Sequence, residues 1–261
     1  MSDDIFSLDG RAAVVTGGVG QLGAEIARGL VARGAKVGIF DVREGGDHGS
    51  IRYFHVDVTD RAAIEAATDE LADAWGAPHV LVNAAAIDSP PDAPAAEVGP
   101  FEEYPVESFE QVMDVNVKGT FLACQVIGAR MAAARRGSIV NVSSIYGMLS
   151  PVQDVYEFRR RDGETFFKPV AYSASKSALY NLTRYLATYW ARDGVRVNTL
   201  TLAGVWNDQP QEFLDAYTAR MPLGRMAEAT EVVGPVVFLA SDASSYVTGA
   251  NVVVDGGWSA W

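Results

Sequence analysis

The sequence has little of several features that would define a function class. It contains one cysteine, so no internal disulfide can form, and Cys124 lies in an apolar helical pattern typical of a small core residue. No apolar run approaches the roughly 20 residues that span a bilayer. Residues 1–10 are acidic and lack the basic, apolar pattern of a secretory signal. We therefore expect a soluble, cytoplasmic protein with no membrane partner.

Positive charge is also scarce. The chain has 21 Lys and Arg against 33 Asp and Glu, a formal net charge of −12 at pH 7. Such a surface repels nucleic acid and anionic lipid, so we expect neither as a partner. With 49% hydrophobic and 21% charged residues the composition is that of an ordinary globular protein. A small-molecule substrate is the expected partner, and no metal ion is expected.

Short apolar runs alternate with longer helical patterns along the whole chain. The runs cover 12–15, 36–41, 51–56, 79–83, 138–142, 195–200 and 250–254, and the helical patterns cover 21–33, 60–75, 106–136, 171–192 and 232–240. Near-continuous apolar strands separated by helices indicate a parallel sheet covered on both faces. The prediction is an α/β, doubly wound parallel sheet (a Rossmann fold) of about seven strands, in one dinucleotide-binding catalytic domain over 1–261.

A glycine-rich turn joins the first strand to the first helix, with the sequence Thr16-Gly17-Gly18-Val19-Gly20-Gln21-Leu22-Gly23. Glycines let the backbone approach a pyrophosphate, and the helix N-terminus offers free N–H groups. Asp41 ends the second strand, where a carboxylate accepts hydrogen bonds from the ribose of NAD and repels the 2′-phosphate of NADP. We therefore expect NAD as cofactor. Arg43, the one nearby basic residue, leaves NADP as the alternative.

Tyr172 and Lys176 are four positions apart and so lie on one helix face. A nearby ammonium favours the phenolate and lowers a phenol pKa from about 10. Such a pair can exchange a proton with an alcohol while hydride moves. Ser144 follows the fifth strand, at the edge where open α/β sheets bind ligands. Asn116 is a polar residue in an apolar helical run, either a participant in the site or a satisfied helix amide.

With these motifs, the chain from Thr16 to the ending Val254-Asp255-Gly256-Gly257-Trp258 resembles the compact single-domain branch of the short-chain dehydrogenases/reductases. The resemblance implies that Tyr172 is the acid/base, that Lys176 holds the ribose, that Ser144 binds the substrate oxygen and that Asn116 holds a proton-relay water. It also implies a homo-oligomer, a tetramer or a dimer. The implied cofactor contacts are Gly17, Gln21, Leu22, Asp41, Asp57, Val58, Asn83, Ala84, Ala85, Tyr172, Lys176, Val205 and Asn207.

The sequence departs from this branch at several points. Gln21 stands where a glycine is usual, so that the loop glycines match the spacing of a longer, sugar-nucleotide-modifying branch whose extra substrate domain this chain lacks. We expect Gln21 to reach a phosphate or the mouth of the substrate site. Ala86 replaces a glycine after the fourth strand, and Leu202-Ala203 replaces the usual Pro-Gly after the sixth.

The largest departure is an insertion at about 149–169. Ser144 and Tyr172 are 28 positions apart, about twice the usual separation, so the added segment begins and ends at the active site. Arg159 and Arg160, with Arg161, are candidate ligands for a carboxylate, phosphate or sulfonate on the substrate. The alternative is a surface or oligomer contact in which the arginines pair with Glu157, Asp162 and Glu164.

A second segment, at about 206–223, follows the sixth strand and is expected to fold over the substrate and exclude water. Trp206, Phe213 and Tyr217 either stack on a sugar ring or only pack the lid. With its insertion and Gly-Gly-Trp ending the chain resembles sugar and polyol dehydrogenases. The expected function is NAD-dependent oxidation of a secondary alcohol of a sugar, a sugar acid (including anionic or sulfonated sugars) or a polyol. The alternatives are a 3-oxoacyl-type ketone reductase and a non-catalytic NAD(H)-binding sensor.

Overall fold

The computed structural model describes residues 4–89, 94–161 and 163–261. Seven of its strands form one sheet in which every pair is parallel, in the order β3-β2-β1-β4-β5-β6-β7. This confirms the predicted doubly wound sheet. The strands are β1 (Ala12–Thr16), β2 (Lys36–Asp41), β3 (Ile51–His55), β4 (Val80–Asn83), β5 (Gly137–Ser144), β6 (Val195–Leu202) and β7 (Asn251–Val254).

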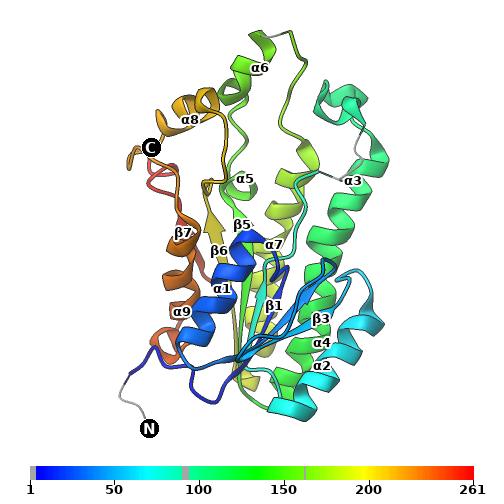
Figure 1. Cartoon of the computed structure of the whole chain (residues 1–261), viewed down its shortest axis with the longest axis vertical. Helices are drawn as coiled ribbons and strands as arrows, with labels where there is room; N and C mark the ends of the chain where they lie inside the picture. Colours follow the sequence, from blue (N-terminus) through cyan, green and yellow to red (C-terminus); the bar gives the residue numbers. More distant parts are fainter. Residues whose placement is uncertain (1–3, 90–93, 162) are drawn as a thin grey trace.

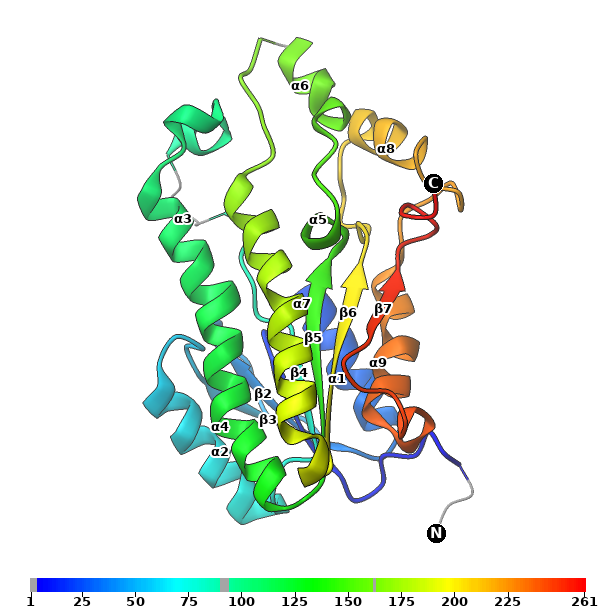
Figure 2. The same ribbon diagram turned by 180° about the vertical axis from the view of Figure 1, so that it is seen from behind.

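Helices cover both faces of the sheet, as Figures 1 and 2 show from opposite sides. On one face α1 (Gln21–Ala32) and α9 (Val233–Ala240) bury an aliphatic cluster that includes Leu30 and Val236. On the other face α2 (Arg61–Trp75), α4 (Thr120–Ala133) and α7 (Val170–Trp190) bury a second cluster, which contains Cys124. Because both faces are covered, the central strands carry unbroken apolar runs rather than alternating ones.

The long helical pattern over 106–136 is one continuous rod with an irregular centre. It consists of α3 (Val106–Met113), a π-helical turn η3 (Asp114–Gly119) and α4. Asn116 lies in the π turn and is 1% exposed. Single π turns inside α-helices are frequent at functional sites, and this one faces the end of the sheet described next.

Three segments extend beyond the carboxyl edge of the sheet, the end to which the strand arrows point in Figure 2. After the short helix α5 (Ile145–Met148), the insertion forms η4 (Gln153–Tyr156) and α6 (Glu157–Arg161), and the segment after β6 forms α8 (Gln211–Thr218). The third is the segment at 88–105, of which 90–93 lie outside the described residues; it holds η1 (Ala95–Val98) and η2 (Phe101–Glu103). The remaining short helices are η5 (Ala191–Asp193), η6 (Ala229–Val232) and η7 (Asp242–Ser244).

The three segments contact one another above the sheet. The Phe167 N–H donates to the carbonyl oxygen of Val98 at 2.7 Å, which joins the insertion to η1. The rings of Tyr156 and Phe213 lie 5.7 Å apart, which joins η4 to α8. Together these segments enclose a cleft of about 580 Å³ at the carboxyl edge. In the described part of the chain no helix is long and apolar enough to cross a membrane.

Candidate active site

The floor of the cleft is the glycine turn between β1 and α1. Gly17 has a positive φ of 68°, and a Cβ placed on it would lie 2.7 Å from the Cα of Ala85. A Cβ on Gly23 would collide with the carbonyl oxygen of Gly17. Gly20 caps α1 without a side chain, so no capping side chain covers the first N–H groups of that helix. The turn therefore presents bare backbone and the positive end of a helix to the cleft, an arrangement suited to a pyrophosphate.

Asp41 lies beside this turn at the end of β2 and is 5% exposed. Its carboxylate accepts hydrogen bonds from the N–H groups of Val19 and Arg43, both at 2.9 Å, and pairs with the Arg43 guanidinium at 3.3 Å. Burial alone would raise the pKa of Asp41, but these bonds outweigh burial and leave its pKa below the ordinary value. Asp41 is thus an anion at neutral pH that fixes both the turn and Arg43, and Arg43 itself lines the cleft.

Tyr172 and Lys176 lie in the first two turns of α7, on the opposite side of the cleft. Lys176 Nζ donates to the carbonyl oxygen of Val142 at 2.9 Å and lies 5.7 Å from the centre of the Tyr172 ring. The expected lowering of the tyrosine pKa is not what this structure gives. Burial raises the pKa of Tyr172, the charge of Asp88 raises it further, and a hydrogen bond with Ser144 lowers it only in part. Burial also lowers the pKa of Lys176 to about 8, opposed by Asp88.

Ser144 ends β5 and caps α5, its Oγ accepting from the N–H of Tyr146 at 3.2 Å. Its hydroxyl lies in the same cleft as Tyr172, close enough to lower the pKa of the phenol in part. The neighbouring Ser143 instead donates to the carbonyl oxygen of Lys176 at 2.9 Å and so fixes α7 to β5. The structure therefore brings Ser144, rather than Ser143, to the tyrosine.

Asn116 is engaged in a clamp on the backbone. Its Oδ1 accepts from the N–H of Ile87 at 2.8 Å, and its Nδ2 donates to the Ile87 carbonyl oxygen and to Ser175 Oγ, both at 2.9 Å. All the polar atoms of the amide thus have protein partners. The clamp sets the position of Asp88, the next residue, which lines the cleft.

The sequence-predicted site residues fall into two groups. Those that line the cleft are Gly17, Gln21, Leu22, Ala84, Ala85, Ser144, Tyr172, Lys176, Val205 and Asn207. Those outside its lining are Asp41, Asp57, Val58, Asn83, Asn116, Arg159, Arg160 and Trp206. Within the second group Asp57 accepts from Thr59, and Asn83 donates from Nδ2 to Asn141 Oδ1 at 2.9 Å, while its own buried Oδ1 has no partner among the residues that the structure describes.

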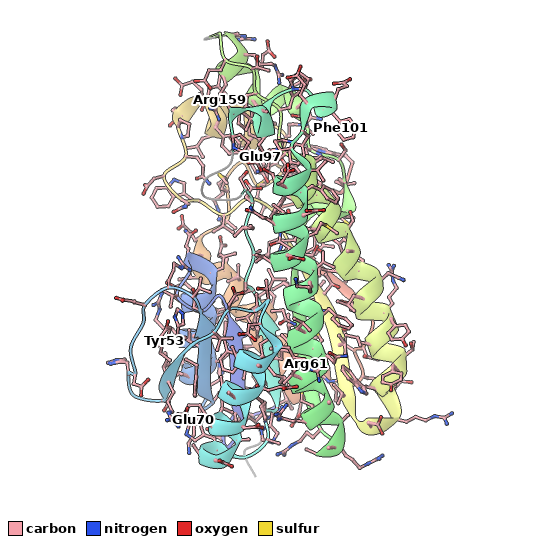
Figure 3. The ribbon with its side chains drawn as sticks, turned by 90° about the vertical axis from the view of Figure 1, so that its right-hand side faces the viewer. Tyr53, Arg61, Glu70, Glu97, Phe101 and Arg159 are labelled. Carbon is pink, nitrogen blue, oxygen red and sulfur yellow. The ribbon has the colours of Figure 1, made fainter. Side chains whose placement is uncertain are left out.

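The arginines of the insertion take the surface arrangement rather than the substrate-facing one. Arg159 pairs with Glu164 at 2.6 Å and lies 4.0 Å from the centre of the Phe166 ring. Arg160 pairs with Glu157 at 2.7 Å and donates to two backbone carbonyls. Figure 3 shows Arg159 at the outer end of the molecule. Both guanidinium groups therefore hold the insertion together through contacts within that same segment.

The part of the insertion that does line the cleft was missed by sequence reasoning. Lys168, whose side chain is 13% exposed, forms an ion pair with Asp88, and its Nζ lies 5.4 Å from the centre of the Tyr172 ring. Tyr146 and Tyr156 also line the cleft. Their closeness in sequence to the predicted catalytic residues could have indicated two of them, since Lys168 lies four residues before Tyr172 and Tyr146 lies two after Ser144.

The segment after β6 supplies an aromatic wall. Phe213 and Tyr217 line the cleft, their rings are 5.3 Å apart, and Tyr217 stacks on Trp258 at 4.4 Å. Trp206 is 44% exposed and contributes its backbone instead, since its carbonyl oxygen accepts from Gln21 Nε2 at 2.7 Å. Gln21 thus ties the glycine turn to the start of this segment.

Comparison with known proteins identifies the family. A family model described as enoyl-(acyl carrier protein) reductase matches residues 18–259. A D-threitol dehydrogenase of Mycolicibacterium smegmatis is 34% identical over 97% of this chain and 95% of its own length. A galactitol 2-dehydrogenase (L-tagatose-forming) of Cereibacter sphaeroides is 35% identical over 98% of both, and a 3-alpha-(or 20-beta)-hydroxysteroid dehydrogenase of Mycobacterium tuberculosis is 36% identical over 96% and 90%.

Solved structures agree with this assignment. A short chain dehydrogenase from Leptospira borgpetersenii with bound NAD+ superposes with a TM-score of 0.86 at 30% identity, covering 99% of this chain and 96% of that one. A gluconate 5-dehydrogenase from Burkholderia cenocepacia in complex with NADP and tartrate gives 0.82 at 28% identity, covering 99% and 98%. The chain belongs to the short-chain dehydrogenase/reductase family, whose members are oxidoreductases that use a nicotinamide cofactor.

Proposed function

We propose that this protein is an NAD-dependent dehydrogenase that oxidises a secondary alcohol of a polyol or sugar, with Tyr172 as the acid/base. The observation that carries the proposal is that Ser144 and Tyr172 line one cleft together with the bare glycine turn, with Ser144 close enough to lower the pKa of the phenol. Two neighbouring hydroxyls can hold one substrate oxygen between them. A non-catalytic NAD(H) sensor has no need of that pair.

The residues present fit a nicotinamide dinucleotide. The Gly17 and Gly23 positions admit no side chain, which leaves room for a pyrophosphate against the backbone. Small residues, Ala84 and Ala85, continue the floor toward Tyr172 and leave space for a flat ring. When bound there, the cofactor supplies the carbon that accepts or returns the hydride.

The protein's own groups then handle the proton. Tyr172 is neutral in the free protein because its pKa is raised, so it is ready to donate a proton to a ketone. Oxidation needs the phenolate, and the charge of Lys176, 5.7 Å from the ring centre, favours that form. Ser144 Oγ holds the substrate oxygen in line with Tyr172. Because the pKa of Tyr172 is raised above its ordinary value of about 10, we expect alcohol oxidation to rise with pH across the alkaline range and ketone reduction to hold constant until the pH exceeds about 10.

Asp41 supports NAD over NADP, because its buried carboxylate would repel a 2′-phosphate. Arg43 favours the opposite choice, since it lines the cleft beside the glycine turn. The solved relatives bind either cofactor. We expect kcat/KM to favour NAD in the wild type, Asp41→Asn to reduce that preference roughly 10-fold or more, and Arg43→Gln to lower only the use of NADP. A preference for NADP in the wild type would contradict the proposal.

The relatives support a polyol substrate, since threitol and galactitol dehydrogenases match the chain over nearly its whole length. The hydroxysteroid dehydrogenase marks cyclic alcohols as the second candidate. A 3-oxoacyl-type reductase is disfavoured by Asp41, because such an enzyme would more naturally use NADPH.

We also propose a homo-oligomer. Tyr185 and Tyr189 lie on α7, stack on each other at 6.0 Å, and are 63% and 64% exposed. Exposed stacked aromatics on a long helix are typical of a protein interface. Light scattering should give a mass above that of one chain, and Tyr185→Glu with Tyr189→Glu should lower it.

The first experiment is a measurement of NADH formation with NAD, and separately with NADP, across polyols, sugars, sugar acids, sulfonated sugars and cyclic alcohols. We expect turnover with NAD and polyols. Tight NADH binding without turnover of any alcohol or of the matching ketones would instead support the sensor.

A further inference from the structure

We infer that the Asp88–Lys168 ion pair, with Tyr146 and Tyr156, forms a subsite for the hydroxyl groups next to the reacting carbon, and that it selects neutral polyols over sugar acids. This inference rests on the proposed function. The four residues line one cleft and come from α5, the insertion and the segment after β4. No sequence motif of the fold places them there.

The side chain of Lys168 is 13% exposed and that of Asp88 is 52% exposed, so the ion pair lies at the mouth of the cleft, and the backbone beside each residue is held in place. The Lys168 N–H donates to Gln153 Oε1 at 2.9 Å, while the Asn116 clamp holds Ile87, the residue before Asp88. The ammonium lies 5.4 Å from the centre of the Tyr172 ring. A group held at this distance reaches the carbons beside the one that exchanges hydride with the cofactor.

The two tyrosines add buried hydroxyl groups, one of which lacks a hydrogen-bond partner in the described structure. Tyr146 is 8% exposed, and its Oη is buried without a partner at hydrogen-bonding geometry in the described structure. Tyr156 lies close enough that each phenol influences the other's pKa, and burial raises both. A buried hydroxyl without a partner is costly, and a substrate hydroxyl would satisfy it.

Charge decides between a neutral and an anionic ligand. A vicinal diol offers donors to the Asp88 carboxylate and acceptors to the Lys168 ammonium, so both ions stay partnered when it binds. A sugar acid at the same place would bring its carboxylate against Asp88. The nearest cation that might offset this, Lys168, already pairs with Asp88, and Arg159 and Arg160 pair with Glu164 and Glu157.

The test compares Asp88→Asn and Lys168→Met with the wild type on galactitol, on gluconate and on cyclohexanol, which has no second hydroxyl. We expect the wild type to favour galactitol over gluconate. Each variant should raise the KM for galactitol roughly 10- to 100-fold, the effect of losing a hydrogen bond to a charged group, with kcat little changed. Asp88→Asn should also raise gluconate use relative to galactitol, because it leaves the Lys168 charge unpaired.

Cyclohexanol separates the subsite from a general effect on Tyr172, whose pKa Asp88 helps to raise. That effect acts on all alcohols alike. Arg61→Gln, which removes one partner of an exposed ion pair with Glu65 and does not belong to the cleft lining, is the control for loss of a charge and should change none of these rates. Equal losses on galactitol and cyclohexanol, or a wild type that favours gluconate, would overturn the inference.

The two proposals fail in different ways. If no alcohol is turned over, the proposed function is wrong. Saturation-transfer NMR of galactitol with NADH-loaded protein still tests the subsite, since it needs binding alone. A galactitol signal in the wild type that is lost in Asp88→Asn and Lys168→Met supports the inference, whereas signals of equal strength in all three proteins, or in none, contradict it.

Discussion

The two edges of the sheet both carry a hollow with buried charge, and they differ in what that charge contacts. The hollow at the amino edge is about 530 Å³ and is lined by Arg11, His79 and Arg196, among others. Arg196 donates to the carbonyl oxygens of Leu239, Ser241 and Val247 at 2.8 to 3.2 Å. There the cations complete the end of α9 and the following turn.

At the carboxyl edge, by contrast, polar groups face one another and the cleft. Ser144 contacts Tyr172, Lys168 pairs with Asp88, and Tyr146 Oη has no partner at hydrogen-bonding geometry. A hollow with charges is therefore not by itself a site. The distinguishing feature is whether its polar atoms are engaged by backbone or left for a ligand.

The largest expected effect belongs to the carboxyl edge. Tyr172→Phe should lower kcat by roughly 10²- to 10⁴-fold, because it removes the acid/base. NADH binding, followed by fluorescence, and the unfolding midpoint should stay close to wild type. Unchanged turnover would show that another group moves the proton.

The matching change at the amino edge should affect stability and leave catalysis intact. Arg196→Met removes the donor for three carbonyl oxygens and should lower the free energy of unfolding by about 2–4 kcal/mol in urea titrations. The kcat per folded molecule should not change, and Arg196→Lys should recover part of the stability. A loss of kcat in a folded variant would mean that the two edges are coupled.

A change at Lys176 tests whether burial of a charged group at the carboxyl edge lowers the free energy of unfolding. Its folded pKa of about 8 lies below its ordinary value, so its burial penalty is fully present below pH 8 and is relieved as pH rises toward 10.5. Lys176→Met should therefore gain about 1–3 kcal/mol of unfolding free energy at pH 7, less at pH 10, and lose activity. A variant less stable than wild type at pH 7 would show that the bond to Val142 outweighs desolvation.

His79 gives the smallest effect, at the amino edge. Burial, then the charges of Arg136 and Arg11, lower its pKa to about 4. The unfolded chain takes up a proton near pH 6.5 while the folded one does not, so stability falls as pH drops from 6.5 toward 4. His79→Asn keeps an acceptor for the Ala12 N–H and should reduce this loss of unfolding free energy at low pH by about 1–2 kcal/mol. If the loss of stability between pH 6.5 and pH 4 were the same in this variant as in the wild type, other groups would be its cause.

The fold was readable from the sequence because it depends on local pattern. Each strand was found within a few residues of its bounds, since strands buried on both faces must be apolar throughout. The glycine turn and the Tyr172–Lys176 spacing were readable for the same reason, because backbone approach and helix periodicity are properties of short segments. The π turn at Asn116 could not be predicted from the sequence, because residue spacing does not indicate where a helix takes one extra residue per turn.

Long-range packing decided the rest of the site. The sequence singled out Arg159 and Arg160 by composition, yet partners within their own segment engage them, while Lys168 reaches the cleft through contacts with Gln153 and Asp88. It likewise suggested a lowered Tyr172 pKa, which burial reverses. The sequence by itself determined the sheet, the glycine turn and the placing of Tyr172 and Lys176 on one face of a helix. Only the tertiary structure decided which charges face the substrate, because charge partners and desolvation depend on distances between segments far apart in the chain.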